Sequence, residues 1–114
     1  MTDISLLLID YKKAAGAYGK ANENFDNIAA NTEHEKLMRL YSQLKKIGDH
    51  SFKELRVYLK DKDNYVALWA ATHLIDKYPE EAKETLNNLM KEDSMVAMTA
   101  EAVLDLWKTG KLTL

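Results

Sequence analysis

The chain has 114 residues, 46% of them hydrophobic and 30% charged, which is the balance of a soluble globular protein with room for one core. It has no cysteine, and this excludes disulfides, thiolate zinc sites and cysteine nucleophiles. The net charge of −2 divides into +2 over residues 1–60 (10 basic, 8 acidic) and −4 over residues 61–114 (6 basic, 10 acidic), so the strongly basic face of a dedicated nucleic-acid binder is not expected.

The first predicted helix occupies residues 2–24, with Thr2 as its expected N-cap. Its buried side is predicted from apolar residues at helical spacing, which are Ile4, Leu7, Leu8, Tyr11, Ala15 and Tyr18. The apolar run at its start lacks a preceding basic segment and a following cleavage site, so it is a poor signal peptide. No stretch approaches the roughly 20 apolar residues that span a membrane. We therefore expect a cytoplasmic protein with no membrane segment.

Two interpretations are open for the start of the second helix. Thr32 and Glu35 fit a capping box, in which each side chain satisfies a backbone donor near the other, and this would begin the helix at residue 32. The alternative is a longer helix that begins near Asp26. Both interpretations end at Gly48, because glycine takes a left-handed conformation without steric cost. The apolar stripe of this helix is Leu37, Leu40, Tyr41, Leu44 and Ile47.

Four further helices are predicted between the polar loops. The third covers about Ser51 to Leu59, and the fourth follows the Asp63 cap region and ends before Pro79. Pro79 also opens the fifth helix at its first position, where no amide hydrogen is needed. The sixth helix runs from about Ser94 to Lys108 and ends at Gly110. The residues predicted to face inward in the third, fourth and fifth helices are Phe52, Leu55, Leu59, Val66, Trp69, Ala70, His73, Leu74, Ala82, Leu86 and Leu89.

A period of 30 residues relates the fourth predicted helix to the sixth. The matched pairs are Asp63 and Asp93, Val66 and Val96, Ala67 and Ala97, Ala70 and Ala100, and Leu74 and Leu104. The register continues backwards in the pairs Leu44 and Leu74, Lys53 and Lys83, Glu54 and Glu84, and Leu59 and Leu89. A helical hairpin of this length cannot bury its apolar stripe alone, so such hairpins stack on one another.

The repeat predicts an all-α chain of about six helices, arranged as a short α-solenoid. We expect a single domain over residues 1–114, in which residues 2–24 form an N-terminal capping helix. Its units are expected at about 32–60, 62–90 and 92–114.

The repeated stretch resembles HEAT-like repeats in the pattern D-x-x-V-x-x-x-A-A-x-x-L, followed by a proline turn and an A-x-x-x-L helix. The residues that carry this resemblance are Asp63, Val66, Ala70, Ala71, Leu74, Pro79, Ala82 and Leu86. The whole chain also resembles a family of small bacterial proteins known only as a domain of unknown function. The residues for this second resemblance are Asn31, Gly48, Pro79, Glu80, Ala82, Leu104, Trp107 and Gly110.

The resemblance implies a fold and an interaction module, and some proteins of this kind lie beside secreted toxins as candidate immunity proteins. HEAT-like repeats usually place an arginine after the valine, where this chain has Ala67 and Ala97. An anion-binding role for that arginine is therefore not carried over.

Candidate catalytic and metal sites have simpler explanations. His73 and Asp76 lie one helical turn apart, which could suit a metal or an acid–base pair, but no second histidine lies at ligand spacing. We therefore interpret His73 as a partly buried helix residue near Trp69 and Asp76 as a solvated carboxylate. His34 and His50 complete no site, although His50 could cap the third helix. With no nucleophile motif or phosphate-binding loop, neither an enzyme nor a cofactor is predicted.

Large apolar residues are interpreted mainly as core. Trp69 and Trp107 are assigned to the core, because burial of such a side chain contributes on the order of 2–3 kcal/mol. Met90, Met95 and Met98 are assigned to gap-filling between short helices, with an adaptable binding surface as the alternative. The end at residues 95–114 lacks a polar cap, so Trp107, Leu112 and Leu114 would cover it, or a homodimer would bury it.

The basic residues between 36 and 60 form the main surface feature of the sequence. They are Lys36, Arg39, Lys45, Lys46, Lys53, Arg56 and Lys60. They suit an acidic partner or a phosphate backbone, or they only keep helix faces soluble. If they scatter around their helices, the nucleic-acid interpretation loses its support.

The sequence therefore predicts a non-catalytic protein–protein interaction module, of an immunity or regulatory type, with a protein partner. Nucleic-acid backbone binding on a basic helical face is the alternative. The second helix of each hairpin would line a concave side, which gives Lys53, Arg56, Lys60, Lys83, Asn87 and Lys91 as expected contacts.

Overall fold

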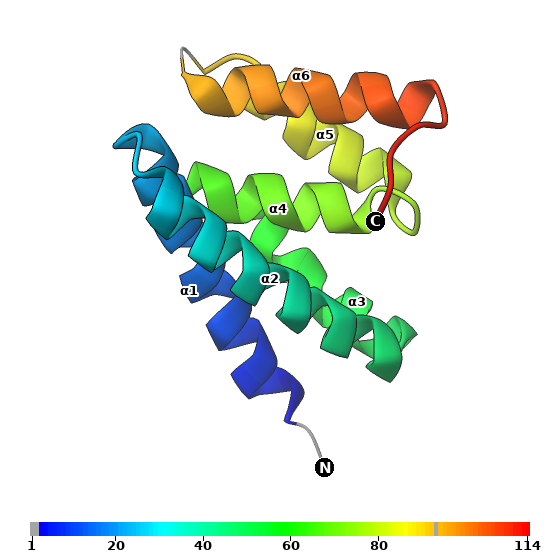
Figure 1. Cartoon of the computed structure of the whole chain (residues 1–114). Coiled ribbons are helices and arrows are strands. Elements are labelled where there is room, and N and C mark those ends of the chain that lie inside the picture. The colour runs from blue at the N-terminus through cyan, green and yellow to red at the C-terminus, as the bar shows by residue number, and fades with distance from the viewer. Residues whose placement is uncertain (1–2, 93) are drawn as a thin grey trace. The chain divides into compact units, whose positions relative to one another are not determined.

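The computed structural model describes residues 3–92 and 94–114, and the regular secondary structure of these residues is helical (Figure 1). The predicted all-α class and the six α-helices are confirmed within the described residues. Their bounds are α1 Ile4–Glu23, α2 Asn27–Ile47, α3 Asp49–Leu55, α4 Asn64–Leu74, α5 Pro79–Leu89 and α6 Met95–Lys108, with a 3-10 helix η1 at Arg56–Lys60. None of the helices in the described ranges is long and apolar enough to cross a membrane.

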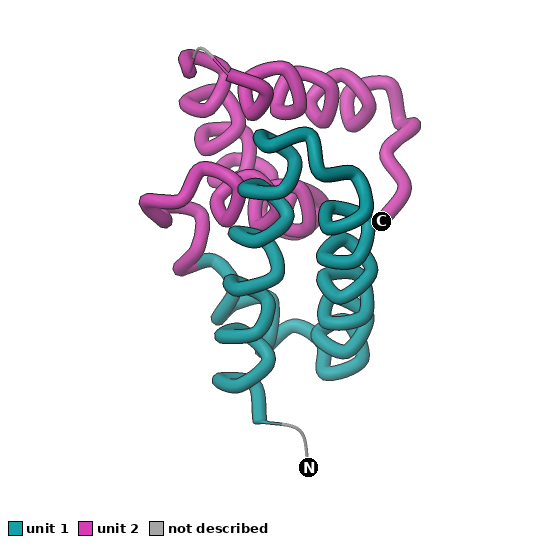
Figure 2. Tube along the Cα trace, turned by 60° about the vertical axis from the view of Figure 1, so that its left-hand side comes forward, with its two compact units in different colours: residues 1–56 teal, residues 57–114 magenta. Residues whose placement is uncertain are grey.

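The chain divides into two compact units, residues 1–56 and residues 57–114 (Figure 2). The first unit holds α1, α2 and α3, and the second holds α4, α5 and α6. The boundary falls inside the predicted repeat unit 32–60. Stacking of the hairpins into a solenoid therefore stays a prediction.

In the first unit, α1 and α2 form an antiparallel hairpin that is packed along its length. Predicted burial is confirmed for Leu7, Leu8, Tyr11, Ala15, Leu37, Tyr41 and Leu44. Ile4, Tyr18 and Leu40 are half-buried, and the prediction is wrong for Ile47, which is exposed. The short helix α3 packs against α2, where the rings of Tyr41 and Phe52 have centroids 6.1 Å apart. Predicted burial of Phe52 and Leu55 is confirmed.

Aspartate residues cap both α1 and α2. Asp3 caps α1, and its carboxylate accepts a hydrogen bond from the Ser5 amide at 2.9 Å; the predicted cap Thr2 lies outside the described residues. The capping box at Thr32 is wrong, because Asp26 caps α2 and its carboxylate accepts from the Ala29 amide at 3.0 Å. Thr32 lies inside α2. The alternative start near Asp26 is confirmed.

The turn between α1 and α2 is a Schellman motif with an unusual residue at its left-handed position. The Asp26 amide donates to the Ala21 carbonyl at 2.9 Å, and the Phe25 amide donates to the Asn22 carbonyl at 3.1 Å. Phe25 has φ 58° and its side chain is 79% exposed. Glycine is the usual residue here, because a Cβ is crowded in the left-handed region.

Replacement of Phe25 by glycine is therefore expected to raise the free energy of unfolding. The gain should be about 0.5–1 kcal/mol, because relief of backbone strain exceeds the extra entropy of a glycine in the unfolded chain. Urea denaturation followed by circular dichroism measures it. The control is Phe25→Ala, which keeps the strain and should change the stability little; an equal gain from alanine would assign the effect to loss of an exposed ring.

The junction between α2 and α3 is built on Gly48 and Ser51. Gly48 follows α2 as predicted, but its φ 98° and ψ −151° lie outside the left-handed helical region that was expected. Its amide donates to the Leu44 carbonyl at 3.1 Å. The buried Ser51 hydroxyl lies 2.6 Å from the Leu44 carbonyl oxygen and 2.7 Å from that of Gly48. The hydroxyl thus lies within hydrogen-bond distance of a carbonyl oxygen in the last turn of α2 and of the carbonyl oxygen of the residue before α3. His50 is exposed in that first turn and supplies no side-chain cap.

In the second unit, the three helices α4, α5 and α6 each contact the other two. Asp63 caps α4 as predicted, with its carboxylate 2.9 Å from the Tyr65 amide nitrogen. Pro79 opens α5 as predicted, with Glu80 and Glu81 in the first turn. The buried Thr85 hydroxyl donates to the Leu59 carbonyl at 3.2 Å and ties α5 to η1.

The helix α4 is buried on all sides, whereas the sequence predicted one buried face. Nine of its residues are buried, including Tyr65, Leu68 and Thr72 outside the predicted stripe. Trp69, which was assigned to the core, is half-buried.

Three of the residue pairs related by the 30-residue repeat are buried in both α4 and α6. They are Val66 and Val96, Ala70 and Ala100, and Leu74 and Leu104, which are at most 4% exposed in both helices. Ser94 occupies the N-cap position of α6 without a side-chain capping hydrogen bond, while Asp93, the repeat partner of Asp63, lies outside the described residues.

Candidate functional site

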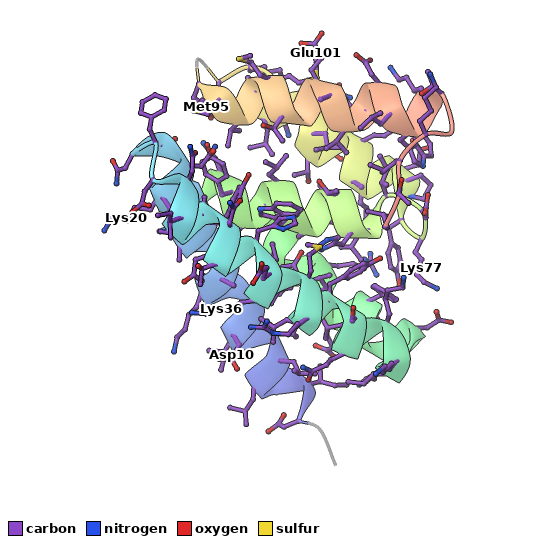
Figure 3. All side chains as sticks on the ribbon, in the orientation of Figure 1. Asp10, Lys20, Lys36, Lys77, Met95 and Glu101 are labelled. Carbon is purple, nitrogen blue, oxygen red and sulfur yellow. The ribbon has the colours of Figure 1, made fainter. Side chains whose placement is uncertain are left out.

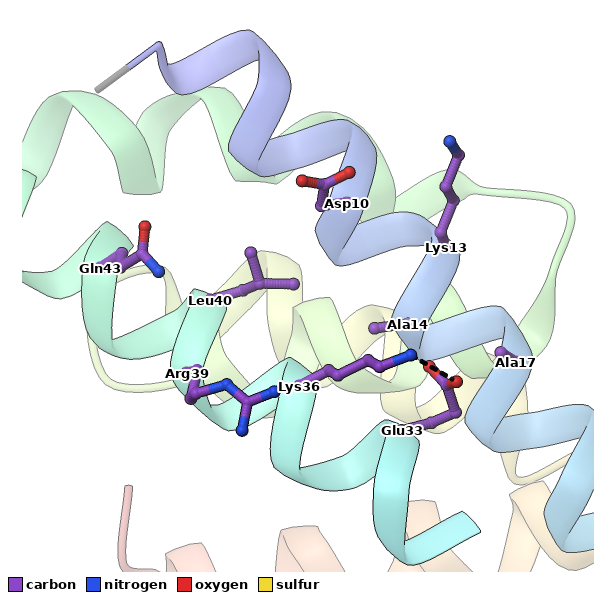
Figure 4. A pocket seen from close by; sticks show the side chains of 9 residues that line it. All are labelled: Asp10, Lys13, Ala14, Ala17, Glu33, Lys36, Arg39, Leu40 and Gln43. Atoms are coloured by element: carbon purple, nitrogen blue, oxygen red, sulfur yellow. Dashed lines mark hydrogen bonds and ion pairs between the residues drawn. The ribbon is translucent and has the colours of Figure 1, made fainter. Parts of the chain in front are cut away.

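A cleft of about 540 Å³ lies between α1 and α2 in the first unit (Figure 4). This volume falls within the range of ordinary ligand pockets, about 300–1,000 Å³. It is lined by Asp10, Lys13, Ala14 and Ala17 of α1 and by Glu33, Lys36, Arg39, Leu40 and Gln43 of α2. Both sets recur at three- and four-residue spacing, so each lies on one side of its helix. The cleft is therefore a property of the hairpin alone.

The floor of the cleft is apolar and shallow. Ala14 is buried, Leu40 is half-buried, and Ala17 is exposed, so short side chains leave the space between the helices open. Leu6 lies one turn before Asp10 and is 60% exposed. The line from Leu6 to Ala17 covers eleven residue steps, which is about 16 Å of helix. That length suits a short helical segment of a partner.

The rim of the cleft carries an excess of positive charge. The Lys36 ammonium lies 3.2 Å from the Glu33 carboxylate, and Figure 4 shows its side chain extended toward α1. Among the described residues, Lys13 and Arg39 make no ion pair or side-chain hydrogen bond, and both are exposed. Asp10 is the remaining acidic group of the lining. The two unpaired cations make this cleft complementary to an acidic ligand.

The six residues expected from the sequence divide between the two units. Lys53 is exposed on α3 and Arg56 is half-buried, while Lys60 is exposed at the end of η1. Lys83 and Asn87 lie one turn apart on α5, and Lys91 follows this helix. A concave face shared by all six stays a prediction.

Lys83 is engaged within the second unit. Its ammonium lies 3.5 Å from the Glu80 carboxylate and 5.3 Å from the centroid of the Trp107 ring. The Trp107 indole donates a hydrogen bond to the Asp76 carboxylate at 3.1 Å, which ties α6 to the residues that follow α4. Trp107 is half-buried, so its assignment to the core is only partly right. A partner that used Lys83 would have to compete with these contacts.

The histidines form no catalytic or metal constellation in the described part of the chain. His73 lies near Trp69 as predicted, with ring centroids 5.5 Å apart, but it is only 3% exposed and thus more deeply buried than expected. His34 lies 6.1 Å from the Tyr18 ring. Residues 3–92 and 94–114 contain no group of three acidic or histidine side chains able to hold a metal ion.

Three of the four basic residues of α2, Lys36, Arg39 and Lys46, fall within an arc of about 80° of the helix, and Lys45 lies outside it. Lys36 and Lys45 are nine residues apart, which at about 100° per residue places them on opposite sides. Lys36 faces the cleft, whereas the Lys45 ammonium lies 5.3 Å from the centroid of the Tyr41 ring. Lys45 therefore lies apart from the side of α2 that carries Lys36, Arg39 and Lys46.

The cleft was missed by the sequence analysis, because residues 2–24 were interpreted as a cap and only their buried side was considered. The available signal was the pair Ala14 and Ala17 beside Lys13, since small residues on an outer helix face leave room for a ligand.

No protein-family model matches the chain, and no curated protein matches it in sequence. In structure it is similar to the protein RPA1889 from Rhodopseudomonas palustris CGA009. The TM-score with that crystal structure is 0.89 at 18% sequence identity, and the match covers 100% of this chain and 95% of that one. At this identity the similarity establishes a shared fold alone.

Proposed function

We propose that this chain is a non-catalytic protein-binding module whose α1–α2 cleft receives an amphipathic helical segment of a partner protein. The observation that carries the proposal is the combination of an apolar floor with unpaired cations on the rim. Amphipathic helices bind in grooves of this kind by placing apolar residues at helical spacing against the floor.

The chemistry of the cleft specifies the segment. Its apolar side chains would lie over Ala17 and along Leu6, and its carboxylates would meet Lys13 and Arg39. The planar guanidinium of Arg39 can bind a carboxylate with two parallel hydrogen bonds. Such charges on the rim set specificity and association rate more than affinity. The expected partner segment is therefore a helix with one apolar and one acidic side.

The HEAT-like character and an immunity or regulatory role belong to the same proposal, and they rest on the resemblance in sequence. If the partner is a toxin, the module would neutralise it by covering its active site or its assembly surface. Lys53, Lys60, Asn87 and Lys91 are proposed as additional contacts, because all four are exposed. Nucleic-acid binding is the weaker candidate, because the chain carries a net charge of −2.

The test is capture of a partner by the immobilised protein and by its Ala17→Glu variant. The new glutamate fills the cleft and repels an acidic segment, so the partner that the unmodified protein retains should bind at least about tenfold more weakly, or about 1.4 kcal/mol. Titration of that partner by isothermal calorimetry measures the loss. Asn88→Glu is the matched control, because Asn88 is exposed on α5 in the other unit.

The proposal requires equal affinity for the unmodified protein and the Asn88→Glu variant. Equal loss in both variants would assign the effect to net charge and remove the cleft from the interaction. Capture is repeated after nuclease treatment and at two salt concentrations. If only nucleic acid is retained, and nuclease or salt releases it, backbone binding replaces the proposed function.

A further inference from the structure

The outer side of α6 carries an exposed apolar stripe formed by Met95, Met98, Ala102 and Leu106. Met98 is 73% exposed, Leu106 is 41% exposed and Met95 is 38% exposed. At about 100° per residue, the four positions fall within an arc of about 80°. Trp107, which was expected to cover this end, instead contacts Asp76 and Lys83. The stripe is therefore open to a partner.

The internal repeat allows the exposed side of α6 to be compared with the equivalent side of α4. Thirty residues earlier, Tyr65 and Leu68 of α4 correspond to Met95 and Met98, and they are 6% and 1% exposed. Thr72, which corresponds to Ala102, is 6% exposed. The same side of the repeated helix is thus covered in α4 and uncovered in α6. Residues 111–114 form no helix that could cover it.

We propose that the α6 stripe binds the α6 stripe of a second copy, in an antiparallel pair centred on Ala102. A two-fold axis at Ala102 places Met98 of one copy against Leu106 of the other, because each lies four residues from the axis. Alanine at the axis lets the two helices approach closely. The contact is the same surface patch on both copies, as a closed dimer requires.

The charges at the two ends of α6 favour the antiparallel direction. Glu92 precedes the helix, while Lys108 and Lys111 lie at and beyond its last turn, and all three are exposed. Antiparallel pairing brings the lysines of one copy toward Glu92 of the other, whereas parallel pairing would bring like charges together. Glu101 lies about 100° around the helix from Ala102, so it stays at the flank in water (Figure 3).

The small area of the α6 stripe limits the affinity of the proposed dimer. The 14 residues of α6 span about 21 Å, and a contact of one such helix from each copy lies at or below the low end of specific interfaces, about 1,200 Å². We therefore expect a weak, concentration-dependent dimer. Its mass in sedimentation equilibrium should rise from 13.0 kDa toward about twice that value between micromolar and near-millimolar protein.

Single cysteines test the direction of the pair, because the natural chain contains none. Ala102→Cys should give a disulfide-linked dimer on mild oxidation, since the two residues meet at the axis. Met95→Cys should not link to itself, because residue 95 lies about 21 Å from its own copy along the helix, far beyond the roughly 4.4–6.8 Å between Cα atoms in a disulfide. Mixed Met95→Cys and Thr109→Cys should link.

The solution dimer is tested with Ala102→Glu, and Ala17→Glu is the control with the same substitution on an exposed alanine of α1. We expect Ala102→Glu to remain monomeric over the whole range and Ala17→Glu to dimerise as the unmodified protein does. A monomer at every concentration for the unmodified protein would overturn the proposal. So would a dimer that Ala102→Glu leaves intact, or self-linkage of Met95→Cys as efficient as that of Ala102→Cys.

Discussion

Replacement of Leu86 by alanine is expected to lower the free energy of unfolding by about 2–5 kcal/mol. Leu86 is fully buried on α5, the helix that contacts both α4 and α6. The loss combines the transfer free energy of the deleted atoms with the cavity that they leave. Urea denaturation followed by circular dichroism gives the change as a shift in midpoint at constant slope.

The neighbouring Asn87→Ala variant is the control, because Asn87 is exposed on the same helix. Its stability should stay within about 0.5 kcal/mol of the unmodified protein. If the two variants lost the same amount of stability, Leu86 would not lie in the core.

The second large effect is expected at the junction of α2 and α3. Gly48→Ala should lower the free energy of unfolding by about 1–3 kcal/mol, because φ 98° with ψ −151° lies in a region that is essentially restricted to glycine. A Cβ at this position would meet no atom within 4 Å, so the loss comes from the backbone and not from a clash. The same denaturation experiment measures it.

Gly110→Ala serves as the matched variant. Gly110 also has a positive φ, 73°, and open space around its missing Cβ, but it follows α6, and residues 111–114 contain no helix. Its replacement should cost about 1 kcal/mol. The greater loss is expected at Gly48, which joins α2 to α3. A greater loss at Gly110 would contradict a glycine-only conformation at Gly48.

The helices could be predicted from local chemistry wherever one residue type has no competitor. Pro79 is the one proline of the sequence, and it opens α5 as predicted, whereas Asp63 and Asn64 were both candidate caps, and Asp63 is the one that caps α4. Asp26 and Thr32 are equally good caps by residue type. The choice between them depends on where the chain reverses, which is decided by packing of α2 along α1. Sequence periodicity does not contain that information.

The candidate site was less predictable than the fold, because it depends on the outer faces of helices. The basic residues between 36 and 60 could be recognised as a group in the sequence. In the structure, Lys36 lines the cleft, whereas the Lys45 ammonium lies over the Tyr41 ring on another side of α2. The cleft requires α1 and α2 to be paired in register, so that Ala17 and Arg39 line one space. The uncovered stripe on α6 could be expected from the repeat, since Met95 and Met98 stand where α4 has Tyr65 and Leu68.

Both tryptophans belong to residues 57–114, and Trp107 holds α6 through Asp76 and Lys83. The first unit contains tyrosine and phenylalanine but no tryptophan. Intrinsic fluorescence excited at the red edge of tryptophan absorption is therefore a reporter of the second unit alone, whereas circular dichroism sums the helices of both. Denaturation curves from the two signals coincide only if both units unfold in one cooperative transition. The natural distribution of chromophores thus lets the melting of each half be followed without a label.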